Sequence, residues 1–465
     1  MKQSFAVINI TRLKFDELHK QPPLKLDSNY LKYLIHYILT KQAFFVERET
    51  FLELPIDDIS DQYISIGEKA KLARHDKHKK HIDYLFNNNF TVRRSRTTTI
   101  QVSVLFRDEY ISGKKSFGYR ISDRLKGKPI LIDFIDDNRL ITKIKDSTSI
   151  IDPVINSGKY KFLKKYFVFE PRQPNLLKID LAKAFQLCKN RYETHRSYTK
   201  YLNEASQIVE MHNGVFRIYY NKETDGRIHS NITRLPKVYR KFLNYNNKAL
   251  VEVDLSASIL FFISVILSKS IPIDIVKKYS ILLMIYKSLE TVDNKEIQEF
   301  ENITLSGSIY NYFIPLFIQK YDIEQLTQLY KRIDDEPYNG EAHQQRKLVK
   351  KRLLGMFFAQ ADNYPVEQSI FGSKFPTLLK GINDFKNENG YKMFSHALFQ
   401  LEAYLMIDLS ALEFKKAFSK KAPIFTLHDC LITTVGHEKE LALIMRTVFN
   451  QSLGVAPDMT IKVWN

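Results

Sequence analysis

The sequence predicts an α+β protein with more than one domain. Its 465 residues are about three times the length of a typical domain, so we expect two or three domains. Apolar residues recur at helical spacing within residues 1–90 and again over 176–211, whereas residues 91–170 and 215–220 are rich in short strand-like runs. Hydrophobic residues make up 44% of the chain and charged residues 26%, which excludes a wholly disordered protein.

The chain is strongly basic. It carries 70 Lys and Arg against 52 Asp and Glu, a net charge of +18. Such an excess favours a polyanionic partner, and nucleic acid is the first candidate. Residues 66–96 hold nine of these cations against three acids. This segment forms either a solvated helix face or a contact with phosphates, and His75, His78 and His81 within it leave zinc binding as a third, weaker interpretation.

Cysteine content and hydropathy indicate the compartment. The two cysteines, Cys188 and Cys430, are too few for a disulfide framework, so we expect a cytoplasmic protein. The first residues lack the apolar core of a signal peptide, and the longest apolar stretch, residues 259–267, is too short to cross a bilayer. We therefore expect no membrane partner, and we expect a monomer.

Two acidic residues stand at the ends of strand-like segments. Asp254 closes the β-branched run 249–254 and precedes small residues that open a helix. Residues 423–435 predict two strands that meet in a tight hairpin at His428 and Asp429. An Asp at the end of a strand either caps the next helix or binds a divalent cation. Two such acids on adjacent strands can bind two Mg²⁺ ions, which together position the reacting groups of a phosphoryl transfer.

A third segment carries cations and apolar residues on one helix face. Within residues 343–360, Arg346, Lys350, Leu354 and Phe358 are spaced four apart. The cationic end suits a triphosphate and the apolar end a nucleobase, although an ordinary basic amphipathic helix has the same pattern.

These segments resemble motifs A, B and C of the family A polymerases, the superfamily of DNA polymerase I and the phage-type single-subunit RNA polymerases. The family's motif B runs Arg-x-x-x-Lys-x-x-x-Phe-Gly-x-x-Tyr-Gly, and the interval 429 − 254 = 175 residues is close to the family's interval. Further segments resemble family motifs around the primer terminus and the last strand, and the similarity spans about residues 205–465. They are residues 225–230, 235–242, 396–400 and 454–465.

The resemblance implies a role for each matching residue. Asp254, Asp429 and the Leu255 carbonyl would bind two Mg²⁺ ions, with Mn²⁺ as an alternative ion. Lys350 would also protonate the leaving pyrophosphate. The implied nucleotide-binding residues are Arg346, Lys350, Leu354, Phe358, Ile259 and Ser256, and the implied primer–template contacts are Arg227, Arg240, Gln400 and His428.

The resemblance also implies a right-hand polymerase fold, with an antiparallel palm sheet and helical fingers and thumb, beside a basic N-terminal domain of mixed α/β structure. Residues 1–170 match no part of the family and would bind nucleic acid. The expected division of the remainder is thumb and lead-in 171–242, palm 243–269 with motif A, fingers 270–390 with motif B, and palm 391–465 with motif C.

The implied function is template-directed nucleotidyl transfer, in which a primer 3′-hydroxyl is extended with nucleoside triphosphates by two-metal catalysis. We expect a DNA polymerase of replication without proofreading, with DNA primer–template as partner and RNA as an alternative template. The alternatives are a ribonucleotide-using primase or single-subunit RNA polymerase, a two-metal nuclease or transposase, and a catalytically silent nucleic-acid-binding homologue. Three departures from the family leave the sugar preference open: Ile259 replaces Glu, Phe358 replaces Tyr, and Cys430 replaces Glu or Ser.

Overall fold

The structure is a computed structural model in which the chain forms two compact units. It describes residues 4–10, 26–49, 64–65, 78–87, 89–93, 99–107, 118–123, 125–167, 176–334, 336–418 and 421–465. The first unit contains the described residues up to Tyr219, together with Ser230–Asn247 and Asn465, and the second contains Tyr220–His229 and Lys248–Trp464. Helices and antiparallel strands occur in both units, so the predicted α+β class is confirmed. None of the described helices has the length and apolarity needed to span a membrane.

The first unit begins with a strand rather than the helix that the sequence pattern predicted. β1 (Phe5–Ile10) pairs antiparallel with β7 (Ile130–Ile135) along its whole length. All six residues of β1 are buried, which explains its continuous apolar character and the absence of an alternating pattern. The buried side chain of Asn213 holds the strand in place, since it exchanges two hydrogen bonds with the backbone of Ala6.

Helices also occupy part of the region that was expected to be rich in strands. α4 (Asn138–Thr148), α5 (Pro153–Ser157) and α6 (Lys161–Lys164) follow β7 directly. α4 begins after Asp137, whose side chain accepts hydrogen bonds from the backbone N–H groups of Arg139 and Leu140. The other elements of this unit are β2 (Ile64–Ser65), β3 (Asn89–Arg93), β4 (Thr99–Ser103), β5 (Leu105–Arg107), β6 (Gly118–Ile121), β8 (Ile150–Ile151), β9 (Leu177–Ile179), β10 (Arg217–Tyr220, whose last residue belongs to the second unit), β12 (Leu243–Tyr245), α2 (Ser28–Glu49), α3 (His78–Asn87), α7 (Leu181–His195), α8 (Tyr198–Asn213), α9 (Asn231–Arg234) and α10 (Lys237–Arg240).

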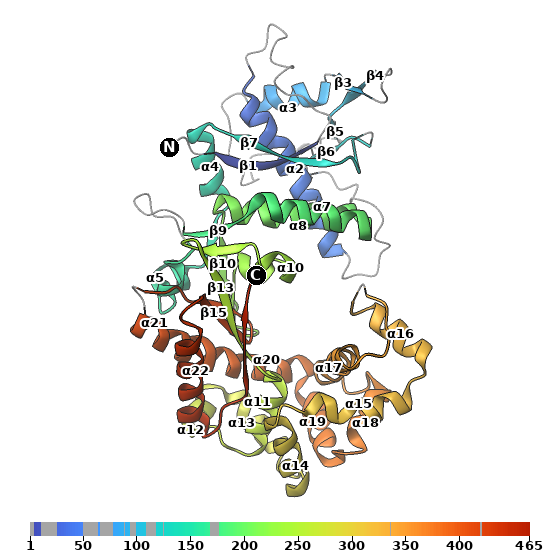
Figure 1. Ribbon diagram of the computed structural model, residues 1–465, viewed down its shortest axis with the longest axis vertical. Coiled ribbons are helices and arrows are strands. Elements are labelled where there is room, and N and C mark those ends of the chain that lie inside the picture. The colour runs from blue at the N-terminus through green and yellow to red at the C-terminus, as the bar shows by residue number, and fades with distance from the viewer. Residues whose placement is uncertain are drawn as a thin grey trace. The chain divides into compact units, whose positions relative to one another are not determined.

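The second unit is built on a central strand. β13 (Lys248–Leu255) pairs antiparallel with β15 (Cys430–Thr434) on one side and with β16 (Met459–Val463) on the other. β14 (Phe425–Leu427) pairs with β15 and completes the predicted hairpin. α22 (Glu438–Leu453) packs against the sheet (Figure 1).

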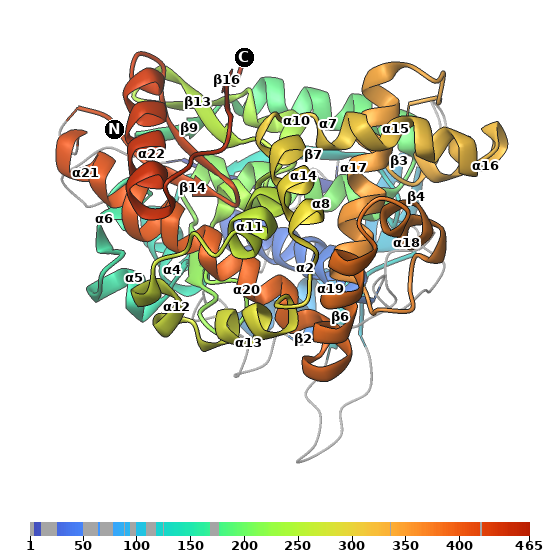
Figure 2. The same ribbon diagram turned by 90° about the horizontal axis from the view of Figure 1, so that it is seen from below.

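A fully buried helix follows the central strand. Every residue of α11 (Ser258–Leu267) is buried, so the longest apolar stretch of the sequence is a core helix. It packs against α14 (Asn294–Leu305) and α20 (Tyr391–Ala403), as Figure 2 shows. α20 continues into a π-helix, η2 (Tyr404–Ala411), which packs against both strands of the hairpin.

The cationic segment forms a helix close to its predicted bounds. α17 (Ala342–Phe358) ends two residues before the predicted end and packs against α15 (Ile309–Lys320) and α18 (Pro365–Gly372), as Figure 2 shows. The remaining elements of this unit are β11 (Ile228–His229), α12 (Ile273–Lys278), α13 (Ser280–Ser288), α16 (Ile323–Lys331), α19 (Pro376–Asn389) and α21 (Leu412–Phe418).

The last strand is fastened to the central strand by a buried polar contact. The indole Nε1 of Trp464 donates to Oε2 of Glu252 at 2.8 Å, and both residues are buried. The Trp464 backbone N–H also donates to the Leu250 carbonyl. The indole therefore satisfies a carboxylate that burial would otherwise leave unpaired.

We predict that Trp464→Phe lowers the free energy of unfolding by about 1–3 kcal/mol, because the buried Glu252 carboxylate loses its donor. Urea unfolding followed by circular dichroism measures the change, since the substitution removes the chain's one Trp. Ile461→Thr, at an exposed position of the same strand, is the control and should change stability by less than about 0.5 kcal/mol. Equal stabilities for the wild type and Trp464→Phe would contradict the assignment.

Candidate functional site

The end of β13 lies beside the hairpin turn between β14 and β15, so the two predicted metal-binding acids, Asp254 and Asp429, stand on neighbouring segments. Asp254 stands opposite Cys430 in the ladder between β13 and β15. The backbone N–H of Leu255 donates to the carbonyl of Asp429 at 3.2 Å. Both acids are partly exposed, whereas Leu255 is buried. Strand pairing therefore holds Asp254 near the turn that bears Asp429, although the two residues lie 175 positions apart in the sequence.

The backbone turns sharply beside each acid. Ala257 has a φ of 51° and His428 a φ of 52°, both in the left-handed region that residues with a Cβ seldom adopt. Ala257 immediately precedes α11, and His428 occupies the tip of the hairpin. Such strain persists only where the surrounding structure holds it, and it is common at functional sites.

A third acid, which sequence reasoning missed, lies beside these two. Glu402 on α20 is completely buried. Ser258 links it to the site, since the Ser258 hydroxyl donates to Oδ2 of Asp429 at 3.2 Å and the same side chain lowers the pKa of Glu402. No sequence pattern marked Glu402, because it stands alone within an apolar helix two residues after Gln400.

Arg227 neutralises this buried carboxylate. Its Nε donates to Oε1 of Glu402 at 3.0 Å, and its Nη2 contacts the same oxygen. Burial raises the pKa of Glu402 to about 7, an increase that Arg227 opposes and Asp429 reinforces. Burial outweighs the neighbouring guanidinium, as expected for a carboxyl group removed from water.

Aromatic rings extend the site from Arg227 towards α17. The Arg227 guanidinium lies over the ring of Phe399, 4.2 Å from its centroid. The ring of Phe399 in turn lies 5.2 Å from that of Phe358, the last residue of α17. Gln400 donates through Nε2 to the Thr224 carbonyl at 3.2 Å. These contacts bring together Arg227, Phe358 and Gln400, which the sequence had assigned to the same site.

Two histidines lie between the Arg227 loop and the hairpin tip. The ring of His229 is 6.0 Å from that of the exposed His428, and its Nε2 is 3.0 Å from Oδ2 of Asp225. Asp225 also accepts a hydrogen bond from the Arg227 backbone N–H. His229 was not identified as a site residue from the sequence. The one signal for it was its position within the segment 225–230.

Two cations of α17 lie beside a buried tyrosine. Arg346 and Lys350 lie over the ring of Tyr310, at 5.6 and 5.9 Å from its centroid. Burial raises the pKa of the Tyr310 hydroxyl, Arg346 lowers it and Asp429 raises it further. Tyr310 therefore lies within electrostatic reach of both the cations and the acid.

Several contacts hold α17 in position. Lys386 donates to the Met356 carbonyl at 2.9 Å, and Arg352 pairs with the buried Glu367 at 2.5 Å. Gly355 is required by close approach, because a Cβ at this position would lie 2.7 Å from the hydroxyl of Tyr364. Close packing against Tyr364 therefore explains why a glycine stands at this position of α17.

The remaining predicted site residues have different surroundings. Ser256 donates its backbone N–H to the Asp458 carbonyl, Ile259 is buried in the first turn of α11, and Leu354 is half-buried on α17. Arg240 belongs to the first unit, where its Nε donates to the Leu235 carbonyl at 3.3 Å.

The donor set at the end of β13 is suited to a hard divalent cation. Asp254, Asp429 and the Leu255 carbonyl offer only oxygen atoms, the ligands that Mg²⁺ prefers. Within the described part of the chain, no three His, Cys, Asp or Glu side chains gather into a complete metal site. Mg²⁺ commonly takes one or two carboxylates from the protein and its other ligands from water and substrate phosphates, so two carboxylates are a sufficient set.

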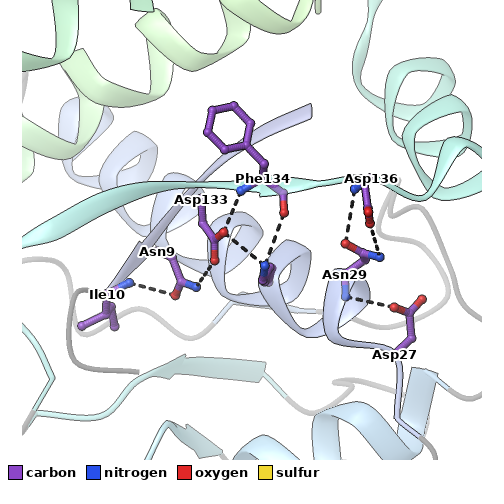
Figure 3. A network of polar contacts seen from close by, with 8 residues as sticks. Asn9, Ile10, Asp27, Asn29, Asp133, Phe134 and Asp136 are labelled. Carbon is purple, nitrogen blue, oxygen red and sulfur yellow. Dashed lines mark hydrogen bonds and ion pairs between the residues drawn. The ribbon is translucent and has the colours of Figure 1, made fainter. Parts of the chain in front are cut away.

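A second pair of acids, Asp133 and Asp136, has structural partners (Figure 3). Asp133 pairs with Lys32 at 3.1 Å and accepts a hydrogen bond from Asn9, while Asp136 exchanges hydrogen bonds with Asn29. These contacts tie β7 to β1 and α2. The network therefore gives Asp133 and Asp136 a structural role, and no nuclease site is needed to explain why two acids stand here.

The basic segment 66–96 is described only in part. His81 is fully buried, its Nε2 accepts a hydrogen bond from the Asp27 backbone N–H at 2.8 Å, and its ring contacts Tyr30. His81 is therefore a core residue. His75 and most of the cations lie outside the described residues.

Comparison with solved structures gives a distant structural relationship. No model of a known protein family matches the chain, and no curated protein matches its sequence. Among solved structures, the chain is similar to the POL domain of Pol1 from M. smegmatis in complex with DNA primer-template and dNTP. The identity is 11%, the match covers 70% of this chain and 68% of the other, and the TM-score is 0.34. Such a low score assigns none of that polymerase's ligands to this chain.

We predict that the buried carboxyl of Glu402 makes stability depend on pH. Because its pKa is raised from 4.5 to about 7 in the folded state, the folded chain binds more protons than the unfolded chain between these values. The free energy of unfolding of the wild type, relative to that of Glu402→Gln, should therefore be highest below pH 4.5. This difference in the free energy of unfolding should fall by up to about 1.4 kcal/mol per pH unit as the pH rises to 7.

Urea unfolding at several pH values between 4.5 and 8 measures this difference. Glu388→Gln, at an exposed position of α19, is the control and should follow the wild type at every pH. A constant difference between the wild type and Glu402→Gln across this range would contradict the prediction.

Proposed function

We propose that the second unit carries a template-directed nucleotidyltransferase site, most simply that of a DNA polymerase. The observation that supports this best is the position of Asp254 on β13, opposite Cys430 and so beside the turn that bears Asp429, in the same unit as the cations of α17. Two carboxylates and a cationic helix match the charge distribution of a nucleoside triphosphate bound for in-line phosphoryl transfer.

In the proposed reaction, a primer 3′-hydroxyl attacks the α-phosphorus of the triphosphate. A new P–O bond forms as the bond to the β-phosphate oxygen breaks, and pyrophosphate leaves. Arg346 and Lys350 hold the triphosphate through charge, and Lys350 donates a proton to the leaving pyrophosphate. Positioning and charge neutralisation supply most of the rate in such reactions.

Asp254, Asp429 and the Leu255 carbonyl would hold Mg²⁺. When bound, the metal neutralises phosphate charge and makes the primer hydroxyl a better nucleophile. Arg227, held by Glu402 and stacked on Phe399, would contact the primer terminus together with His428, and Gln400 would face the primer–template.

This function gives each part of the chain a role in a right-hand polymerase. The sheet of β13–β16 would be the palm and α12–α19 the fingers, with α17 as the nucleotide-binding helix. α7 and α8, which pack against each other in the first unit, would be the thumb. The remaining N-terminal region, with its excess of cations, would bind nucleic acid.

Primer extension tests this function directly. We predict that the chain lengthens a 5′-labelled primer on a DNA template when Mg²⁺ and nucleoside triphosphates are present, and that EDTA abolishes the activity. Asp254→Asn and Asp429→Asn should each lower the rate by about 1000-fold, since about 4 kcal/mol of charge stabilisation is lost. Lys350→Gln should lower it by about 100-fold.

Lys351→Gln is the matched control, because Lys351 is the next residue of the same helix and is exposed. It should retain the wild-type rate. Binding of the primer–template, measured by fluorescence anisotropy, separates a catalytic defect from a binding defect in the Asp variants. Shortening of the primer would instead indicate a nuclease, and binding without any change in primer length would indicate a silent homologue.

Ile259 provides a test of sugar selection. Its side chain is 7% exposed and directly follows Ser258, which contacts Asp429. We propose that its bulk excludes a ribose 2′-hydroxyl, so that deoxynucleotides are preferred. Ile259→Ala should raise the ratio of kcat/KM for ribonucleotides to that for deoxynucleotides by about tenfold, the range expected when steric bulk is removed from a pocket.

Competing single-nucleotide incorporation assays measure this ratio. Ile259→Val, which keeps the β-branch, should stay close to the wild type. A wild-type enzyme that already prefers ribonucleotides, or an unchanged ratio in Ile259→Ala, would refute the steric role.

A further inference from the structure

The first unit contains a cavity of about 270 Å³ that the proposed polymerase site does not use. Its walls come from β1, α2, α4, α8 and β10. A smaller cavity of about 40 Å³ adjoins it, and five residues line both. These shared residues are Thr40, Lys41, Ser206, Glu210 and Arg217.

The shared side of the cavities is cationic. Lys41, Arg217 and Arg234 line it, and Glu210 is the one carboxylate among the described lining residues. Glu210 pairs with Arg217 at 2.8 Å and with Arg234 at 3.4 Å. Three cations against one carboxylate leave a net charge of +2 on this wall, which favours an anionic occupant.

Buried polar atoms without partners also face this region. Neither Nε of Arg217 nor Oε1 of Gln207 has a hydrogen-bond partner among the described residues. A buried, unpaired guanidinium N–H is costly, and an oxyanion would satisfy it. Burial lowers the pKa of Lys41, Arg217 lowers it further and Glu210 raises it, so an anion between the two cations would add to the relief of like-charge repulsion that Glu210 provides.

The rest of the larger cavity is apolar and aromatic. Phe5, Ile144 and Val209 line it together with Tyr37 and His36. His36 accepts a hydrogen bond at Nδ1 from the Ile8 backbone N–H, and burial lowers its pKa to about 4. Its neutral ring therefore carries a proton on Nε2, which can donate to a ligand. The volume is close to the lower end of small-molecule sites, enough for one flat ring and a short polar group.

We propose that this cavity binds a nucleoside 5′-phosphate, with the phosphate against Lys41, Arg217 and Arg234 and the base in the apolar chamber. The ligand is either a free nucleotide or the 5′-phosphorylated end of a nucleic acid strand, because both present the same group. This site contains no residue of the proposed polymerase site, so either assignment can fail without the other.

Equilibrium dialysis of the full chain with ³²P-labelled AMP, GMP, CMP and UMP tests the proposal. We expect saturable binding of at least one nucleotide, with a Kd below about 1 mM. Lys41→Gln removes one phosphate contact, and Ser147→Leu fills the chamber from α4; each should weaken binding by about tenfold or more. Lys183→Gln, which alters a lysine that is 74% exposed, should bind as the wild type does.

The source of the phosphate is resolved with two DNA oligonucleotides that differ only in a 5′-phosphate or a 5′-hydroxyl. Preference for the phosphorylated strand assigns the site to strand ends, and binding of mononucleotides alone assigns it to free nucleotides. Absence of saturable binding of every probe overturns the proposal. Equal binding of inorganic phosphate and nucleotides also overturns the proposal. Wild-type affinity in both Lys41→Gln and Ser147→Leu, once circular dichroism has verified that the two variants are folded, overturns it as well.

Discussion

Electrostatic repulsion among acidic side chains is the constraint around which the second unit is arranged. Asp254 and Asp429 are held together by the ladder between β13 and β15, and Glu402 is buried beside them. Charges of like sign in a partly dry environment repel strongly, so the arrangement needs compensation. Arg227 supplies it directly to Glu402, and the Ser258 hydroxyl donates a hydrogen bond to Asp429.

The elements that carry the candidate site could be predicted from the sequence because their signals are local. The β-branched run before Asp254, the polar pair at the tip of an apolar hairpin, and the four-residue spacing within α17 each depend on neighbours within a few positions. The same method failed for β1, whose uniformly buried residues have no alternation. It also failed for α4 and α5, where N-caps from Asp137 and Asp152 favour helices in a region rich in strand-like runs.

The partners of the site residues could not be predicted, because they arise from tertiary contacts. Glu402 and Tyr310 belong to helices whose sequences are otherwise ordinary core patterns, and only packing brings them to Arg227 and to the α17 cations. The division into units was equally inaccessible, since residues 220–229 belong to the second unit although the residues on both sides of them belong to the first. Sequence patterns thus indicate which side chains carry chemistry, and the fold determines which of them meet.

The wide turns of the π-helix η2 restrict the changes of sequence length that this chain can tolerate. Consecutive residues of an α-helix are rotated by about 100°, so deleting one residue from η2 would turn α21 by roughly that angle relative to α20. The helix surface that supports β14 and β15 would then face elsewhere, and the loop bearing Asp429 would lose its backing. Substitutions in this stretch preserve that support, whereas a change in its length does not. Natural variants of this protein should accordingly keep the residue count between Glu402 and Leu412 constant even where the side chains differ.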